Sequence, residues 1–318
     1  MKEMTHRHTR ELDIFYKEHK THCTICKQKF ADGMCAHLGY LEDNMPAVLC
    51  DDCSDKLLET VVRYHWTHDE FISPLPTEKL WRYMDLGKFI SLISTQALCF
   101  ASAASFQDPF EGAKGVATNK SKWDSFYTDF FKHAISTAPG NEEKIFADGE
   151  LNSEAERLLS DLNQSGIEER KHTYISCWHC NDYESEAMWK LYSMNVTNAL
   201  AIQTTAQGLY EAFDKDPQID IGKINYIDYQ NKFAPINGSF WYKRKAFAYE
   251  QEVRAVLTDF KAKTSGISIH VDLDKLIEAI DISPYAPSWF EAVVRSVAEK
   301  YGINKPIYYS DMTEAPFF

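Results

Sequence analysis

Several common sequence features are absent from this chain. No run of about 18 apolar residues exists, so a transmembrane helix and a membrane partner are not expected. Residues 1–20 lack the apolar stretch of a secretory signal, which predicts a cytoplasmic protein. There is no glycine-rich phosphate-binding motif, no internal repeat and no low-complexity tract. The missing glycine motif argues against a doubly wound dinucleotide-binding fold.

Positive charge is also scarce. The chain has 34 Lys and Arg against 47 Asp and Glu, a formal net charge of −13, which argues against broad electrostatic capture of nucleic acid or anionic lipid. A local exception is the basic strip Lys243, Arg244 and Lys245 beside Trp241 and Tyr242, a candidate surface for single-stranded nucleic acid. Hydrophobic residues make up 44% of the chain, which is enough for a globular core.

Cysteine, in contrast, is concentrated near the N-terminus, where five of the eight lie between residues 23 and 53. Cys23 with Cys26 and Cys50 with Cys53 form two C-x2-C pairs, a spacing typical of zinc knuckles. Four thiolates close a tetrahedral Zn²⁺ site and leave no position for a substrate. We therefore predict a structural zinc ion that supplies much of the folding free energy of this module.

Two further candidate ligands, Cys35 and His37, lie between the knuckles, and the arrangement resembles the zinc-stapled treble clef of HNH nucleases. That family places a histidine after the second knuckle and an acidic residue beside the first histidine. Ser54 and Ala36 occupy these positions here. The departures favour a structural or target-recognising module, with a degenerate HNH nuclease centred on His37 as an alternative.

The rest of the sequence predicts an α+β domain with a mixed or antiparallel sheet. Two prolines within residues 71–77 interrupt the pattern, so we place a zinc module at 1–72 and the main domain at 73–318. Segment 136–150 is expected to be an insertion, either a lid or an ordinary loop. Expected strands are 80–83, 97–102, 174–178, 199–204, 221–229, 252–259, 267–271, 281–283 and 307–309. Expected helices are 55–66, 86–93, 103–112, 121–135, 153–170, 184–192, 273–280 and 288–300.

Several motifs of the main domain resemble the DUF2971 domain, a bacterial family of unassigned function. The resemblance covers about residues 78–260. Its motifs are Leu80–Tyr83, Leu98–Ser102, Ser105–Glu111, Ile175–His179, Ala187–Tyr192 and Tyr249–Arg254.

A more distant resemblance concerns the order of an arginine on a first strand, a serine on a middle strand and Glu-x-Glu at a later strand. This order is similar to the R-S-E group of ADP-ribosyltransferases. By that resemblance Arg82 would contact the phosphates or ribose of NAD, and Ser176 would support the nicotinamide ribose. Glu252 would bind the ribose 2′-hydroxyl and stabilise the oxocarbenium-like centre, and Glu250 would orient or deprotonate the acceptor. Candidates for stacking on nicotinamide are Trp81, Tyr83, Trp178 and Tyr249.

The two glutamates also have a simpler interpretation. A period of two places Glu250 and Glu252 on one side of a strand, where two carboxylates repel each other unless a cation or a reactive group lies between them. A solvated sheet edge is the alternative. Arg82 could likewise pair with Asp108 or Glu111 rather than bind phosphate, and the serine could be purely structural.

The sequence thus predicts an NAD-dependent ADP-ribosyltransferase that modifies RNA, DNA or protein and carries a structural zinc ion. A bacterial transferase of this kind would be a toxin or an anti-phage effector, with a neutralising antitoxin or regulator as its partner. The first alternative is a non-catalytic, zinc-stapled sensor or adaptor that binds a nucleotide or a protein. The second is the degenerate nuclease.

Overall fold

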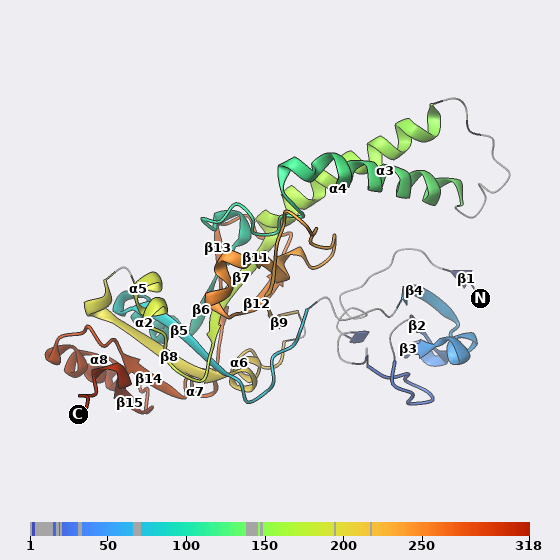
Figure 1. Cartoon of the computed structure of the whole chain (residues 1–318). Helices are drawn as coiled ribbons and strands as arrows, with labels where there is room; N and C mark the ends of the chain where they lie inside the picture. The colour runs from blue at the N-terminus through green and yellow to red at the C-terminus, as the bar shows by residue number, and fades with distance from the viewer. Residues whose placement is uncertain are drawn as a thin grey trace. The chain divides into compact units, whose positions relative to one another are not determined.

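The computed structural model describes residues 2–3, 15–16, 19, 21–30, 34–65, 71–137, 146, 149–193, 195–216 and 218–318. The chain divides into two compact units, residues 1–70 with 216–218, and residues 71–215 with 219–318 (Figure 1). Each unit is described by itself.

The first unit contains a small sheet in the order β1-β4-β2-β3. β2 pairs antiparallel with β3 and β4, and β1 pairs parallel with β4. The elements are β1 (Lys2–Glu3), β2 (Cys35–Tyr40), η1 (Glu42–Asn44), β3 (Pro46–Cys50), η2 (Asp51–Lys56) and β4 (Glu59–His65). Leu38, Val48, Leu49 and the cysteines Cys23 and Cys50 belong to its buried core.

The helix expected at 55–66 is wrong. The 3₁₀ helix η2 ends at Lys56, and the chain continues as the strand β4. Thr60, Val61 and Val62 are β-branched residues, which favour strands. Pairing with β2 along most of its length supplies the tertiary hydrogen bonds that a helical pattern cannot reveal.

The second unit is built on a nine-stranded mixed sheet in the order β13-β6-β7-β5-β8-β14-β15, with β12 pairing to β7 and β9 pairing to β12. All pairs are antiparallel except β14 with β15. The strands are β5 (Lys79–Asp85), β6 (Ala97–Ser102), β7 (Thr173–Cys180), β8 (Ala199–Thr205), β9 (Asp220–Lys223), β12 (Glu252–Thr258), β13 (Gly266–His270), β14 (Ala279–Ile282) and β15 (Ile307–Tyr309). The predicted α+β class with a mixed sheet is confirmed.

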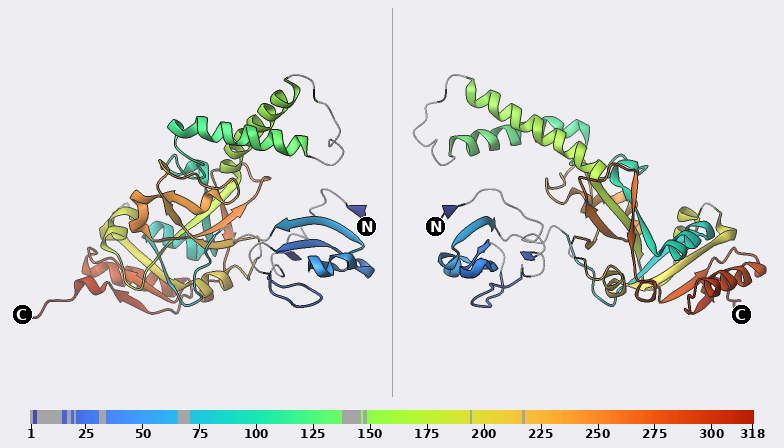
Figure 2. Two further views of the ribbon diagram at one scale, coloured as in Figure 1. Left: turned by 45° about the vertical axis from the view of Figure 1, so that its right-hand side comes forward. Right: turned by 180° about the vertical axis from the view of Figure 1, so that it is seen from behind.

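Helices surround this sheet, and α3 and α4 form a long hairpin that projects from it (Figures 1 and 2). The helices are α2 (Leu86–Thr95), α3 (Lys120–Ser136), α4 (Glu150–His172), α5 (Glu186–Tyr192), α6 (Ala206–Ala212), α7 (Leu273–Leu276) and α8 (Ser288–Lys300). Shorter 3₁₀ helices are η3 (Ala103–Ser105), η4 (Ala117–Asn119), η5 (Val196–Asn198), η6 (Ser239–Trp241), η7 (Lys245–Glu250) and η8 (Asp311–Thr313). Within the described ranges, no helix combines the length and apolar composition needed to cross a membrane.

Three further expected elements differ from the structure. The helical turn at 103–112 is reduced to η3 followed by turns. The helix at 273–280 stops at Leu276, because Ile280 and Ile282 pair with β8 and are fully buried in β14. The strand at 221–229 divides into β9 and β10 (Asn225–Ile227), and β10 pairs with β11 (Tyr242–Arg244) in a separate parallel ribbon. Most of segment 136–150 lies outside the described residues.

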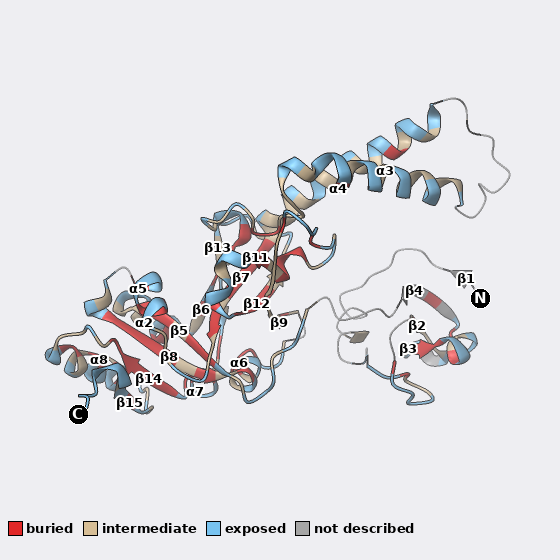
Figure 3. Ribbon diagram, in the orientation of Figure 1, coloured by how far each residue is buried: buried red, intermediate tan, exposed pale blue. Residues whose placement is uncertain are grey.

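The main core lies against the sheet, and buried residues follow the central strands (Figure 3). Phe89 of α2, Leu209 of α6 and Phe290 of α8 pack in the same cluster as Trp178 of β7 and Ile202 of β8. The amphipathic face of α2 is fixed at its start, where the Asp85 carboxylate accepts a hydrogen bond from the Lys88 backbone N–H at 2.9 Å. These contacts pack α2, which directly follows β5, against the sheet.

The sheet opens at β7. On one side β7 pairs with β6 only through Tyr174 and Ile175, and with β5 only through His179 and Cys180. On this side residues 176–178 therefore pair with neither β5 nor β6, and these two strands diverge there. On the other side β12 pairs with β7 over its whole length. We call this opening between β5 and β6 the fork, and it positions the candidate site.

Candidate active site and candidate metal site

A cavity of about 490 Å³ lies at the fork, in the volume range of small-molecule sites. Its walls come from β5, β6 and β7, from α2 and α5, and from the turn before β12. Its polar and aromatic lining includes Trp81, Arg82, Tyr83, Lys88, Cys99, Cys177, Trp178, His179, Tyr192, Glu250 and Glu252. The structure thus brings together in one cavity Arg82 and the Glu-x-Glu pair, which lie far apart in sequence.

Arg82 bridges the two strands that diverge at the fork. Its Nη1 donates to the Ser176 hydroxyl and, at 3.4 Å, to the Cys177 carbonyl. Its Nη2 donates to the Cys99 carbonyl at 3.3 Å, and the guanidinium lies 5.4 Å from the centre of the Trp178 ring. Burial lowers the pKa of Arg82 from its ordinary value. The guanidinium is therefore held in a fixed orientation at the cavity wall.

The alternative partners suggested for Arg82 bind other cations. Asp108 accepts from Arg244 at 2.7 Å, and Glu111 pairs with Arg254 at 2.7 Å. The predicted pairing of Arg82 with either carboxylate is therefore wrong.

Ser176 lies behind Arg82 and not on the cavity surface, with an exposed fraction of only 1%. It faces Ala255 across the β7–β12 ladder, whereas Glu252 faces His179. Because side chains alternate along a strand, Ser176 and Glu252 project from opposite faces of the ladder. The structure therefore brings Ser176 to Arg82 and not to Glu252. The neighbouring Cys177 faces Arg254 across the ladder, so it projects from the same face as Glu252 and lines the cavity with it.

The two glutamates meet at one lysine. Glu250 ends η7, Gln251 has a left-handed φ of 41°, and Glu252 begins β12. Both carboxylates are buried, with exposed fractions of 6% and 4%. The ammonium of Lys243 donates to Glu250 and, at 3.0 Å, to Glu252. A cation therefore lies between the two carboxylates, and a solvated sheet edge does not describe this burial.

The contacts continue into a chain of alternating charges. Fully buried Arg254 donates to Glu252 at 2.7 Å from Nε and pairs with Glu111 at 2.7 Å from Nη1. It also donates to the Phe240 carbonyl at 2.7 Å. We call the series Glu111, Arg254, Glu252, Lys243 and Glu250 the charge chain. It joins two motifs, Asp-Pro-Phe-Glu and Glu-Gln-Glu-Val-Arg, that lie far apart in sequence.

The charge chain gives the two glutamates different protonation behaviour. Burial alone would raise the pKa of Glu252, but the Arg254 and Lys243 cations outweigh it and lower that pKa to about 2. Burial raises the pKa of Glu250, and the contact with Lys243 only partly offsets this effect. Tyr192 of α5 lines the same cavity as Glu250. Glu252 is therefore the ionised member of the pair, and Glu250 is the member that protonates more readily.

The aromatic candidates separate into two groups. Trp81, Tyr83 and Trp178 line the cavity, and the Tyr83 hydroxyl accepts a hydrogen bond from the Ser185 backbone N–H at 2.9 Å. Tyr249, in contrast, is 49% exposed and does not line the cavity.

The basic strip predicted at 243–245 is contradicted by the structure. Lys243 is buried in the charge chain, and Arg244 pairs with Asp108 at 2.7 Å. Lys245 is exposed, and the Arg244 side chain, although 39% exposed, is held by the Asp108 carboxylate. Glu250 and Glu252 neutralise Lys243, and the distant Asp108 neutralises Arg244, so the strip offers no continuous cationic surface to a nucleic acid strand.

Sequence reasoning missed Glu111, Lys243, Arg254 and Cys177 as members of the site. One signal was present, because Arg254 follows Glu252 by two residues and a period of two places both on one strand face. The other contacts depend on tertiary pairing. Glu111 reaches Arg254 only because residues 108–111 pack beside β12 and β11.

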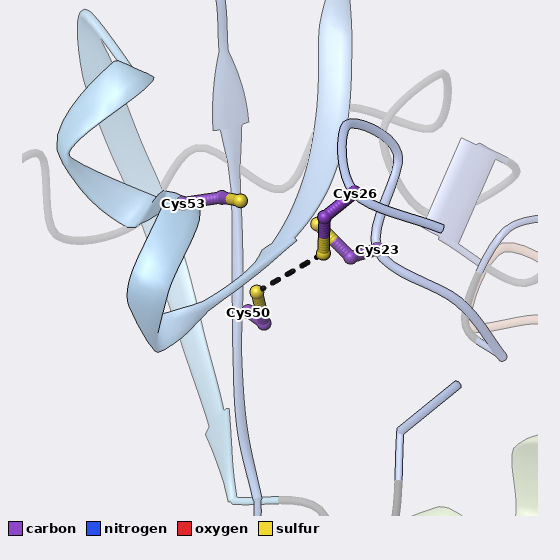
Figure 4. A group of neighbouring side chains, drawn as sticks. All are labelled: Cys23, Cys26, Cys50 and Cys53. Atoms are coloured by element: carbon purple, nitrogen blue, oxygen red, sulfur yellow. Dashed lines mark hydrogen bonds between the residues drawn. The ribbon is translucent and has the colours of Figure 1, made fainter. Parts of the chain in front are cut away.

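In the first unit the four cysteines Cys23, Cys26, Cys50 and Cys53 come together as predicted (Figure 4). Their sulfur atoms all lie within 4.8 Å of one another, and Cys26 Sγ is 3.6 Å from Cys50 Sγ. Tetrahedral Zn²⁺ with bonds of about 2.3 Å separates its sulfur ligands by about 3.8 Å. The donor set and spacing therefore fit a structural zinc ion.

His37 lies outside this cluster. Its Nε2 is 2.6 Å from the Asp51 carboxylate. In the part of the chain that the structure describes, the four cysteines are the only group of three or more potential metal ligands. The described neighbours of His37 therefore do not assemble the divalent-metal site that a nuclease would require.

Comparison with solved structures shows similarity to DarT complexes. The chain resembles DarT from Thermus sp. 2.9 in complex with NAD+, at 9% identity over 76% of this chain and 100% of that chain, with a TM-score of 0.35. The DarT complexes with ADP-ribosylated ssDNA and with carba-NAD+ each match at 10% identity with a TM-score of 0.33. These two matches cover 75% and 74% of this chain, respectively, and 96% of the DarT chain in each case. No family model and no curated protein matches, so the DUF2971 resemblance stays a prediction.

Proposed function

We propose that the protein is an NAD-dependent ADP-ribosyltransferase that modifies a macromolecular acceptor, either RNA, DNA or protein. The observation that carries the proposal is that a single cavity is lined by one fixed guanidinium and by two buried carboxylates whose pKa values are shifted in opposite directions. Environments that separate the pKa values of two neighbouring carboxylates also separate their chemical tasks.

Arg82 would bind the pyrophosphate or the adjoining ribose of NAD. Hydrogen bonds to Ser176 and to two strand carbonyls hold its guanidinium, so little side-chain entropy is lost when the anion binds. In this scheme Ser176 acts by orienting Arg82. Trp81, Tyr83 and Trp178 supply the aromatic surface of the cavity for the nicotinamide ring, whereas the position of Tyr249 does not support such a role.

Glu252 would stabilise the reacting ribose. When the bond between the ribose C1′ and the nicotinamide nitrogen breaks, positive charge develops on the ribose and nicotinamide leaves with the bonding electrons. An ionised, preorganised carboxylate stabilises that charge without reorganising. Its low pKa keeps Glu252 ionised at neutral pH. Glu250, whose pKa burial raises, would accept the proton of the attacking acceptor.

Zn²⁺ would occupy the four-cysteine cluster and stabilise the first unit. Thiolate ligands from Cys23, Cys26, Cys50 and Cys53 fill its coordination sphere, so it would take no part in the reaction. A transferase of this kind in a bacterium would act as a toxin or an anti-phage effector, and would require a neutralising antitoxin or another regulator.

The test is nicotinamide release from NAD by the purified full-length protein, with single-stranded RNA, single-stranded DNA and protein supplied in turn as acceptors. Glu252→Gln removes the charge and keeps the side-chain shape, so release should fall by a factor on the order of 10² to 10³. Glu299→Gln, on the exposed side of α8, is the matched control and should match wild type. Release that persists in Glu252→Gln would refute the assignment. A thermal shift with NAD but no release would indicate a binding module.

A further inference from the structure

We propose that Lys243 is a positioning residue for the transfer reaction, because its ammonium group holds the Glu250 and Glu252 carboxylates in one arrangement. This inference rests on the proposed function and adds a residue that the resemblance to ADP-ribosyltransferases did not assign. Lys243 comes from β11, a ribbon outside the main sheet, so neither glutamate shares an element with it.

The contacts of Lys243 are directed at the candidate site. Its Nζ bonds Glu250, lies 3.0 Å from Glu252 and is 3.7 Å from Glu111. The centre of the Phe247 ring lies 4.9 Å from the same ammonium. Lys243 is only 6% exposed. A cation from solvent could therefore take the place of its ammonium group only if the turn opened.

Charge balance explains why this arrangement requires a lysine. The charge chain holds three carboxylates and only two cations, and burial disfavours the uncompensated negative charge. Arg254 pairs with Glu252 and Glu111, so Lys243 is the cation of the chain that contacts Glu250. Removing it would leave both catalytic carboxylates close together in a buried site, and one of them would take up a proton.

Other groups around Glu250 do not replace this charge. Tyr192, which lines the same cavity, carries only a neutral hydroxyl, and His179 contacts the Glu250 backbone carbonyl, at 2.6 Å. Burial lowers the pKa of His179, which favours its neutral form. Glu252 is itself negative. Lys243 is therefore the charged group that maintains Glu250 as a proton acceptor.

The step that depends on Lys243 is proton transfer from the acceptor. The acceptor atom forms a bond to the ribose C1′ as the bond from C1′ to nicotinamide breaks, and neutral nicotinamide leaves with the electron pair. The acceptor proton moves to the Glu250 carboxylate and is later released to water. Lys243 stays protonated and Glu252 stays ionised throughout. The acceptor proton is therefore the only proton that moves, first to Glu250 and then to water.

The experiment compares the pH dependence of kcat for wild type, Lys243→Met, Lys243→Arg and Lys245→Met. Loss of the cation should raise the pKa of Glu250, so the acidic limb of the Lys243→Met profile should move upward by about 1 to 3 pH units. At neutral pH its kcat should fall by about 100-fold, while KM for NAD changes little. Lys243→Arg keeps the charge and should restore the position of the limb. Lys245→Met makes the same substitution at the exposed neighbour and should match wild type.

A folded Lys243→Met protein with an unmoved acidic limb would overturn the inference, and so would Lys243→Arg with the profile of Lys243→Met. If Lys243→Met does not fold, Lys243→Gln is measured in the same way, and an unmoved limb there has the same meaning. Failure of the proposed function is distinguishable, because wild type itself would then release no nicotinamide with any acceptor.

Discussion

Replacing Arg254 measures how much the charge chain contributes to the unfolding free energy. Its guanidinium is fully buried and pairs with Glu252 and Glu111, whose side chains are 4% and 1% exposed. Arg254→Met keeps much of the volume but leaves two carboxylates without their main cation, and breaking such a buried pair costs about 3 to 5 kcal/mol. Linkage gives a similar figure, since lowering the pKa of Glu252 from 4.5 to about 2 corresponds to roughly 3 kcal/mol.

The sign of the pH dependence follows from the lowered pKa of Glu252. A carboxylate whose pKa is lower in the folded protein contributes stability above its unfolded pKa, near 4.5, and loses it as the pH falls toward 2. Arg254→Met should therefore cost roughly 3 kcal/mol at pH 7 and clearly less at pH 3, where wild type has lost part of this stability.

Urea denaturation of both proteins at the two pH values measures the difference in unfolding free energy. Arg157→Met is the matched control, because Arg157 also contacts two carboxylates, Glu154 at 2.6 Å and Asp161 at 2.7 Å, but on the exposed surface of α4. Solvent screens those pairs, so this variant should keep the wild-type midpoint. A loss below about 1 kcal/mol for Arg254→Met at pH 7, or an equal loss at both pH values, would refute the reasoning.

Two further predictions concern stability. Removing the metal with a chelator should unfold the first unit and leave the second folded, because a structural zinc site contributes folding free energy directly. In a thermal scan, the unfolding transition of the first unit should disappear. An unchanged scan of zinc-loaded protein after chelation would count against the site. Gly112→Ala should lower the unfolding free energy by at least about 1 kcal/mol in urea denaturation, because Gly112 has a φ of +72° and a Cβ there would lie 2.4 Å from the Phe240 ring. Gly166→Ala, where a Cβ meets nothing within 4 Å inside α4, is its control and should be neutral or stabilising.

Local patterns in the sequence determined much of the fold. The four-cysteine cluster was predictable from two C-x2-C spacings, since each knuckle sets its own geometry within four residues. Helices α2, α3, α4, α5 and α8 were expected close to their observed positions because their apolar periodicity is local. The strand β4 and the early end of the short helix α7 were not, because both depend on strand pairing with distant segments.

The candidate site divides in the same way. The order of Arg82, Ser176, Glu250 and Glu252 in the sequence predicted them as site residues. The strand period assumed for the two glutamates was wrong, because Glu250 ends η7 and only Glu252 lies in β12. Only the tertiary structure decided that Ser176 binds Arg82, that Tyr249 is exposed outside the cavity, and that Lys243 contacts both glutamates. The physical reason is that ion pairing between buried groups depends on distance in space. Residues 111, 243 and 254 reach one another through the sheet and the β11 ribbon, and no sequence period records that meeting.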